Sequence, residues 1–248
     1  MENSRSLLRM LLAGGVFVLL PKAALAMHIS EGILPLKWAS LWFLLSLPFM
    51  YLGLRRLSRL SQSSSQTIPL VGLVGSAVFI ISCMPIPVPV AGSCSHPAGS
   101  GIAAILIGPS LSVVVSSVAL VLQALFLAHG GLSTLGANIC SMGVAGAFVG
   151  YGVFWLLMRL GAGWMAAAFL AGLLSDWATY AFTSFELASA LHSGSGSFLP
   201  MFASILIAFV PTQVPLGVLE GFLCVGAYGF VRARRTDLLG VLEEKGAA

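Results

Sequence analysis

The sequence predicts an all-α polytopic membrane protein with seven transmembrane helices, which remain after an N-terminal signal peptide is removed. Of the 248 residues, 58% are hydrophobic and only 8% are charged, and the mean hydropathy is +1.01. A soluble domain is about one quarter charged, so this composition indicates a protein that lies in lipid. The basic residues gather in short clusters at the ends of apolar runs, where they set membrane topology. The net charge of +4 therefore gives no indication of a nucleic-acid partner.

Residues 1–26 have the three parts of a secretory signal peptide. A basic start precedes the apolar stretch Leu7–Leu20, and Ala24-Leu25-Ala26 is a cleavage site of the A-x-A type. The apolar stretch is shorter than the ~20 residues that a spanning helix needs. We therefore expect cleavage after Ala26 and a free α-amino group on Met27. An uncleaved first helix is the alternative.

Seven apolar segments follow, and we expect each of them to cross the membrane. They are Trp38–Leu54, Ile68–Met84, Gly101–Gly108, Leu111–Ala128, Ile139–Met158, Trp164–Phe182 and Phe198–Val231. The third segment is too short to cross comfortably, and a half-span is the alternative. We expect Pro211 and Pro215 to break the last segment, and the Ser- and Gly-rich residues 184–197 to form a loop.

The basic clusters predict the orientation. If the short third segment crosses, all the clustered arginines fall on one side of the membrane: Arg55, Arg56, Arg59, Arg159, Arg232, Arg234 and Arg235. Such clusters lie in the cytoplasm. We therefore expect a multi-pass protein of the inner cell membrane, with the mature N-terminus and His96 outside. The transmembrane domain then comprises residues 27–235, and residues 236–248 form a cytoplasmic tail.

The strongest candidate for chemistry is a metal site made from Met27, His28 and His96. A free terminal amine, the peptide nitrogen of His28 and its Nδ1 atom can chelate one ion through adjoining five- and six-membered rings. A second imidazole, from His96, completes a square of nitrogens. Such sites suit Ni²⁺ and Cu²⁺, and Co²⁺ is a plausible guest. The alternative is an exposed His28 in an external tail and a capping His96.

The residues around His96 allow a second kind of site. Cys94 is a possible soft ligand, and a pair of Cys94 and His96 would favour Zn²⁺ or Cu⁺. Ser93 and Ser95 lie in the same segment and are candidate supporting residues. The other three cysteines lie in apolar surroundings and are expected to be buried packing residues.

Further polar residues stand out because their surroundings are apolar. His129 and Asn138 flank a glycine-rich connection and need partners; they could hold the N-terminal ligand segment, although a purely structural loop is equally compatible. Asp176, Gln213 and Glu220 lie in apolar runs, where polar groups are costly. We take these three as supporting residues, with structural hydrogen bonding as the alternative.

Enzymatic function finds little support in the sequence. It contains no GxSxG elbow, no HExxH motif and no P-loop, so the chain is not expected to hydrolyse ATP itself. Ser95 and His96 are adjacent, which is a poor geometry for a catalytic dyad. A metal-independent structural membrane protein and an intramembrane hydrolase remain the alternatives from other functional classes.

Several ordered motifs resemble the CbiM/NikM family, the substrate-capture membrane subunits of energy-coupling-factor cobalt and nickel importers. The similarity begins at Met27-His28-Ile29 and Leu34-Pro35-Leu36-Lys37-Trp38, and it covers nearly all of 27–235. It continues through Ser93–Pro97, Gln123–Gly143, Asp176-Trp177-Ala178-Thr179-Tyr180, Pro211-Thr212-Gln213-Val214-Pro215 and Glu220-Gly221.

The resemblance implies a seven-helix domain with the Met-His segment inserted into its centre. It implies that the amine of Met27, the peptide nitrogen and imidazole of His28 and the imidazole of His96 hold the metal, with His129 and Asn138 around them. Co²⁺ or Ni²⁺ would be the transported substrate, and no catalytic cofactor would be needed. The segment from Glu31 to Trp38 looks closer to the cobalt branch, which supplies cobalamin biosynthesis. The implied partners are a small CbiN-like membrane subunit, a CbiQ-like coupling subunit and CbiO-like ATPases.

Overall fold

The computed structural model describes residues 28–84, 86–87, 94–192 and 197–236. The proposed signal peptide, Met27, Ser93 and the tail beyond residue 236 lie outside these ranges. Cys94 and Ser95 are described by their backbone only. The described residues are almost entirely helical, which confirms the predicted all-α class.

The helices follow the apolar runs of the sequence. They are α2 Leu36–Ser63, α3 Thr67–Ser82, α4 Ser100–Ile107, α5 Pro109–Phe126, α6 Leu135–Asn138, the π-helix η2 Ile139–Gly146, α7 Ala147–Arg159, α8 Trp164–Leu191 and α9 Phe198–Arg234. Helices α6, η2 and α7 form one continuous helical stretch. A two-residue antiparallel pairing joins β1 (Ile86–Pro87) to β2 (Cys94–Ser95).

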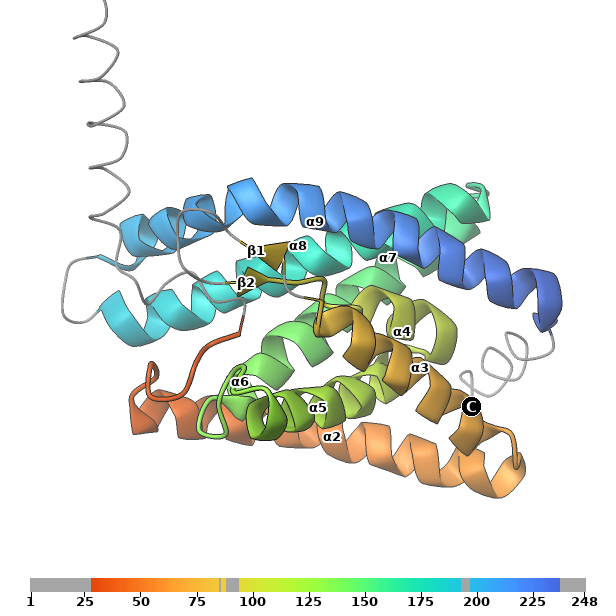
Figure 1. Ribbon diagram of the computed structural model, residues 1–248, viewed down its shortest axis with the longest axis horizontal. Coiled ribbons are helices and arrows are strands. Elements are labelled where there is room, and N and C mark those ends of the chain that lie inside the picture. Colours follow the sequence, from red (N-terminus) through yellow and green to blue (C-terminus); the bar gives the residue numbers. More distant parts are fainter. Residues whose placement is uncertain (1–27, 85, 88–93, 193–196, 237–248) are drawn as a thin grey trace, which may run out of the picture.

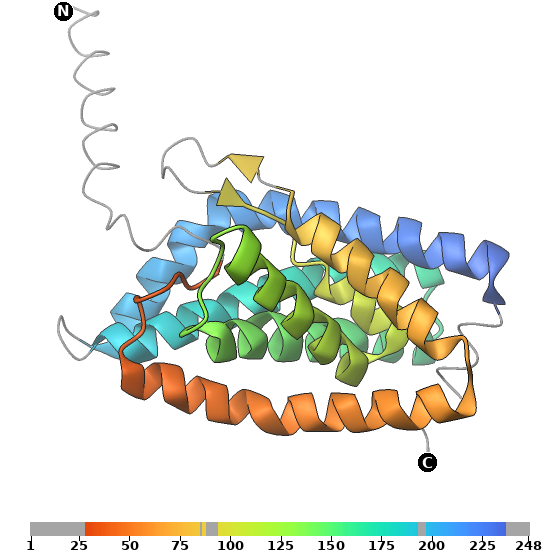
Figure 2. The same cartoon turned by 60° about the horizontal axis from the view of Figure 1, so that its bottom comes forward.

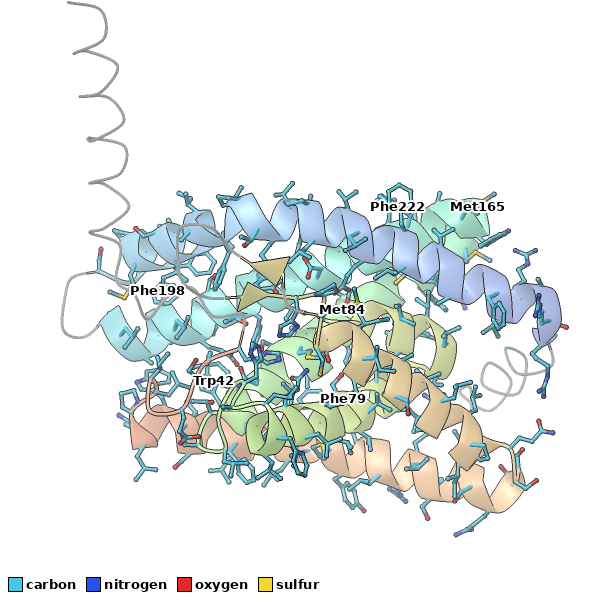
Figure 3. All side chains as sticks on the ribbon, viewed as in Figure 1. Trp42, Phe79, Met84, Met165, Phe198 and Phe222 are labelled. Carbon is cyan, nitrogen blue, oxygen red and sulfur yellow. The ribbon has the colours of Figure 1, made fainter. Side chains whose placement is uncertain are left out.

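Four helical stretches of the described chain are long and apolar enough to cross a membrane: 109–126, 135–159, 164–191 and 198–234. Their outer faces carry large apolar side chains, and Figure 3 shows Phe222 and Met165 on the outside of the bundle. Their exposed fractions are 64% and 58%. An exposed apolar surface of this kind fits a lipid environment. Four of the seven predicted spans therefore correspond to helices of sufficient length and apolarity to cross a membrane.

Two details of the sequence prediction are wrong. Helix α9 runs through Pro211 and Pro215 without a break. Each proline removes one intrahelical hydrogen bond, and the packing of α9 along α8 tolerates that loss. Residues 184–191 continue α8 instead of forming a loop, because the helix formers Glu186, Leu187 and Ala188 place a buried face against the core.

The short helix α4 differs from all the other apolar segments. Its eight residues are all buried, and its length of ~12 Å falls well short of the ~30 Å hydrocarbon core. A left-handed Gly108 (φ +83°) joins it to α5. A Cβ on Gly108 would lie 3.3 Å from Nη1 of Arg56, so α4 ends beside the basic end of α2.

The helices form a bundle with α8 and α9 along one side and α2 along the opposite side (Figure 1). Helix α5 and the α6–η2–α7 stretch lie between them, and α3 crosses α5 (Figure 2). Small residues let α8 and α9 approach closely: a Cβ on Gly172 would lie 2.6 Å from the main-chain oxygen of Glu220. This packing fixes the positions of the loops at the two ends of the bundle.

Candidate metal centre

Three histidines from distant parts of the chain converge at one end of α5. One possible ligand nitrogen from each of His28, His96 and His129 can be chosen so that the three lie within 4.8 Å of one another. Nε2 of His96 lies 2.7 Å from Nε2 of His129, and the ring centroid of His28 is 4.9 Å and 5.0 Å from the centroids of these two rings. His28 and His96 are buried, and His129 is partly exposed.

Three different connections bring these rings together. His28 is the first residue that the structure describes, His96 follows β2, and His129 follows the end of α5. The chain turns sharply just before His129, because Ala128 adopts a left-handed conformation with φ +49°. A non-glycine residue in this conformation is uncommon and is often found at functional sites.

Asn138 holds the backbone immediately after His28. Its Oδ1 atom accepts the N–H of Ile29 at 2.9 Å, and its Nδ2 atom donates to the carbonyl of Ile29 at 3.2 Å. Thr134 donates to the same carbonyl at 2.6 Å. The amide and the hydroxyl together pair both polar backbone atoms of Ile29. They thereby fix the direction in which the chain enters the site.

Two glycines make room for this N-terminal segment. Gly130 has φ +78°, and a Cβ there would lie 3.4 Å from both Nδ2 of Asn138 and Cβ of His28. A Cβ on Gly131 would come within 2.7 Å of the backbone of Glu31. Glu31 in turn donates its N–H to the carbonyl of Gly130 at 3.3 Å. Residues 28–31 therefore pack closely against the backbone of this glycine-rich connection.

Gln123, which the sequence analysis did not select, orients His28. Its Oε1 atom lies 3.0 Å from Nε2 of His28, and its Nε2 atom donates to Oγ of Ser82 at 2.7 Å. The hydroxyl proton of Ser82 is already donated to the carbonyl of Phe79, so Ser82 can only accept from Gln123. This fixes the amide orientation, so Oε1 of Gln123 accepts a hydrogen bond from the protonated Nε2 of His28. The Nδ1 atom of His28 is then unprotonated and able to bind a metal.

A signal for Gln123 exists in the sequence. It is a buried polar residue within the apolar run Leu111–Ala128, and buried polar groups need partners. The sequence cannot show that the partner is His28, because the two residues are far apart in the chain.

His96 is oriented by the backbone around it. Its Nδ1 atom donates to the carbonyl of Pro97 at 3.1 Å, which leaves Nε2 unprotonated and facing His129. Oε1 of Glu220 accepts the N–H groups of both Ala98 and Gly99, the latter at 3.0 Å. Glu220 thereby ties the segment after His96 to α9.

Burial keeps the imidazoles neutral. It lowers the pKa of His28 well below the usual value, with smaller effects from His96 and His129. Burial, together with His129, lowers the pKa of His96 to about 3. Burial also lowers the pKa of His129. Neutral imidazole is the form that binds a transition metal, so the cluster needs little deprotonation before metal binds.

The other predicted site residues lie apart from the histidines. Asp176 and Gln213 are buried in α8 and α9, and Asp176 belongs to no group of possible metal ligands among the described residues. The main-chain oxygen of Gln213 accepts the indole N–H of Trp177 at 3.1 Å. Cys140 donates to the carbonyl of Trp42, consistent with a packing role.

Comparison with known proteins places the chain in a family. Residues 28–238 match the family model CbiM, described as the cobalt uptake substrate-specific transmembrane region. The cobalt transport protein CbiM of Geobacter sulfurreducens is 60% identical over 232 residues, which cover 92% of this chain and 67% of the relative. The CbiM of Sorangium cellulosum is 56% identical over 217 residues, covering 88% of this chain and 96% of the relative.

A solved structure shares the fold. The crystal structure of a truncated transition metal transporter superposes with a TM-score of 0.72 at 21% identity, covering 83% of this chain and 98% of the other. The match to the family model extends over most of the described bundle and includes all three clustered histidines. The chain therefore belongs to the CbiM family of cobalt uptake substrate-specific transmembrane regions.

Proposed function

We propose that this protein captures Co²⁺ and takes part in its uptake across the membrane as the substrate-specific subunit of a transporter. The observation that carries the proposal is the convergence of three neutral imidazoles, with Nδ1 of His28 left free by the bond to Gln123. Cobalt transport is the function named for both curated relatives. Nickel import by the same mechanism is the second candidate, because nitrogen-rich tetragonal sites also suit Ni²⁺.

The proposed ligand set combines the N-terminus created by cleavage with two of the clustered histidines. After cleavage behind Ala26, the amine of Met27, the peptide nitrogen and Nδ1 of His28, and Nε2 of His96 would surround the ion. The third neutral imidazole of the cluster, His129, lies next to His96 and supports its position. An amine with a pKa of about 7.7–8.0 loses its proton at little cost near neutral pH. Cleavage of the leader is therefore part of the mechanism.

The remaining residues are proposed to support this set without touching the ion. Asn138 holds Ile29, and Glu220 holds the segment after His96. Asp176 and Gln213 are buried in α8 and α9, the same two helices that carry Tyr180 and Glu220 to the His96 segment. Ser93 and Ser95 belong to the segment before His96 and are proposed to shape the entrance to the site.

We propose seven crossings, the third of which is the short segment Gly101–Gly108. Helix α4 covers ~12 Å of the ~30 Å hydrocarbon core, and residues 96–99 lead into it from the histidine end. His96 lies at the histidine end and Gly108 lies against Arg56, which supports this path. The clustered arginines then share one end, and the positive-inside rule makes that end cytoplasmic. The mature N-terminus would face outward from the inner membrane.

A family member of this kind works in a multi-subunit transporter. We propose that the partners are a small CbiN-like membrane subunit, a CbiQ-like coupling subunit and CbiO-like ATPases. The ATPases would supply the energy, since this sequence contains no P-loop. The imported cobalt would serve cobalamin biosynthesis.

Cobalt binding and uptake by histidine variants test the proposal. His28→Ala and His96→Ala should each abolish tight Co²⁺ binding by the purified mature protein and cobalt uptake by cells that carry the whole transporter. His192→Ala is the matched control, because His192 lies at the C-cap of α8, where its Nδ1 atom donates to the carbonyls of Ala188 and Ser189. Unchanged binding in both site variants, or a leader still attached to active protein by N-terminal sequencing, would refute the proposal.

A further inference from the structure

Two buried carboxyl groups meet where α8 packs along α9 (Figure 1). Asp176 and Glu220 are both 0% exposed. A Cβ on Gly217 would lie 3.2 Å from Oδ2 of Asp176, and Gly217 lies about one turn before Glu220 on the same face of α9. The two carboxyl groups are therefore neighbours, and they interact electrostatically. Neither of them touches the proposed metal ion.

Glu220 has the donors that a negative charge requires. Its Oε1 atom accepts the N–H groups of Ala98 and Gly99, the latter at 3.0 Å. Gly99 is the N-cap of α4 and has no side chain with which to cap that helix. A carboxylate at this position is stabilised by the two N–H donors and by the partial positive charge of the helix N-terminus. Glu220 is therefore the member of the pair that keeps its negative charge.

Asp176 lies in the opposite situation. Neither Oδ1 nor Oδ2 of Asp176 has a hydrogen-bond partner among the described residues. A charged carboxylate that is fully buried without a partner is costly, and a second negative charge beside Glu220 adds repulsion. A proton on Asp176 removes both costs.

Positive side chains lie far from this pair in the described helices. The elements that pack against α8 are α4, α6, η2, α7 and α9, and the first three contain no Lys, Arg or His. Helix α7 contributes only Arg159, at its last residue, where the guanidinium lies 4.0 Å from the centroid of the Trp155 ring. Arg232 of α9 lies roughly 18 Å beyond Glu220 along the helix.

The other ionisable groups near the pair do not supply a positive charge. His96, in the loop that Glu220 holds, is neutral because it is buried. The remaining ionisable side chains of α8 and of the helices packed against it, apart from Arg234 at the end of α9, are thiols, phenols and one further buried carboxyl group: Cys140, Tyr151, Tyr180, Glu186, Cys224 and Tyr228.

A proton fits this pair better than a metal cation does. Ca²⁺ takes six to eight oxygen ligands, and Mg²⁺ requires a near-octahedral set. The carboxyl oxygens of the pair that lack a described partner are both oxygens of Asp176 and Oε2 of Glu220, which are too few. We propose that Asp176 and Glu220 form a proton-binding site, in which Asp176 carries the proton and Glu220 is the carboxylate that holds Ala98 and Gly99.

The site links protonation inside the bundle to the segment that follows His96. Loss of the proton would place two negative charges between α8 and α9. The repulsion would act on Glu220 and weaken its bonds to Ala98 and Gly99. The proton site itself is independent of cobalt binding, and only the effect of this link on the metal ion rests on the proposed function.

Infrared spectroscopy of the purified protein in detergent, without added metal, tests the site. A protonated carboxyl group has a C=O stretching band that a carboxylate lacks. The sequence contains two aspartates, Asp176 and Asp237, so ¹³C at the aspartate side-chain carboxyl shifts only their bands. At pH 7 the unaltered protein should show one such shifted band, and Asp176→Asn should remove it. Asp237→Asn is the matched control and should leave the band in place.

Titration with alkali tests the part that Glu220 plays. Glu220→Gln removes the neighbouring charge but keeps an oxygen that can accept the N–H groups of Ala98 and Gly99. The band of Asp176 should then disappear at a pH about one unit lower, or more, than in the unaltered protein. Glu186→Gln is the control, because it removes another buried carboxyl group of α8, roughly 15 Å along the helix, and should leave the midpoint unchanged.

Three results would overturn the proposal: no ¹³C-shifted band at pH 7, a band that survives in Asp176→Asn, or an unchanged midpoint in Glu220→Gln. Loss of the band on adding Na⁺ or Mg²⁺ at constant pH would also overturn it and assign the pair to a metal cation. If Asp176→Asn does not fold, the labelled Asp237→Asn protein still decides, because Asp176 is then its only aspartate. No cobalt is used, so failure of the proposed function would leave these results unaffected.

Discussion

Gln123 connects two of the three clustered histidines. Its side-chain oxygen lies 3.0 Å from Nε2 of His28, and its main-chain oxygen accepts the N–H of His129 at 3.2 Å. One residue near the end of α5 thus orients one imidazole and positions the turn that carries another. The same residue is anchored to α3 through Ser82. The geometry of the site therefore depends on the packing of α3 against α5.

Replacing Gln123 should weaken metal binding without removing any ligand. Gln123→Leu keeps a similar volume but loses the acceptor that holds His28 in the tautomer with a free Nδ1. Loss of such a partner typically costs 10–100-fold in metal affinity. Competition titration of Co²⁺ against a chelator would measure the change. Gln66→Leu, at an exposed position near the opposite end, is the control. Equal affinity of the Gln123 variant and the unaltered protein would contradict this role.

Replacing Asn138 should loosen the N-terminal segment. Asn138→Ala removes two hydrogen bonds to Ile29. It leaves the N–H of Ile29 unpaired, at a cost of about 1–3 kcal/mol, while Thr134 still donates to the carbonyl of Ile29. We expect faster amide exchange at residues 29–33 and weaker Co²⁺ binding. Asn138→Asp keeps the acceptor for the N–H of Ile29 but not the donor, so it should show an intermediate loss. Exchange rates identical to those of the unaltered protein would show that Asn138 does not hold residues 29–33 in place.

Adding one methyl group to Gly131 should displace the segment formed by residues 28–31. Gly131→Ala puts a Cβ within 2.7 Å of the Glu31 backbone, so residues 28–31 must shift. We expect a loss of Co²⁺ affinity of tenfold or more with little change in melting temperature. Gly152→Ala is the matched control: its Cβ would meet nothing within 4 Å, and alanine is the better helix former by about 1 kcal/mol. A larger loss of Co²⁺ affinity in the Gly152 variant than in the Gly131 variant would contradict the packing of residues 28–31 against Gly131.

Acid should destabilise the metal-free protein in a defined range. His96 has a pKa of about 3 in the folded state and about 6.5 when unfolded. Below pH 6.5 the unfolded state binds more protons, so the free energy of unfolding falls as the pH drops from 6.5 toward 3. Each such histidine lowers the free energy of unfolding by at most about 1.4 kcal/mol per pH unit.

The melting temperature of metal-free protein in detergent, measured between pH 7.5 and 4.5, would show this dependence. It should be flat above pH 7 and should decline below pH 6.5. His96→Ala should decline less steeply, and His192→Ala should follow the unaltered protein. A melting temperature that rises on acidification would be inconsistent with buried neutral imidazoles.

The sequence predicted much of the fold because a membrane-spanning helix is specified by the residues within its own segment. A run of apolar residues long enough to cross lipid predicts a helix by itself, and the segments that became α5, α7, α8 and α9 were placed in this way. The errors lie where tertiary packing overrides local signals. Pro211 and Pro215 break isolated helices, yet α9 continues through them beside α8. Serine and glycine near residue 190 suggested a loop, yet buried contacts extend α8 to Leu191.

By itself, the sequence determined the membrane class, the basic end of the bundle and the residue types able to bind a transition ion. Composition, charge clusters and the Met27-His28 pair are local properties, and they need no knowledge of distant contacts. Only the tertiary structure decided that His28, His96 and His129 meet, that Gln123 sets the tautomer of His28, and that Asp176 meets Glu220 between α8 and α9. These relationships join residues far apart in the chain. They depend on how the helices pack, which no local pattern specifies.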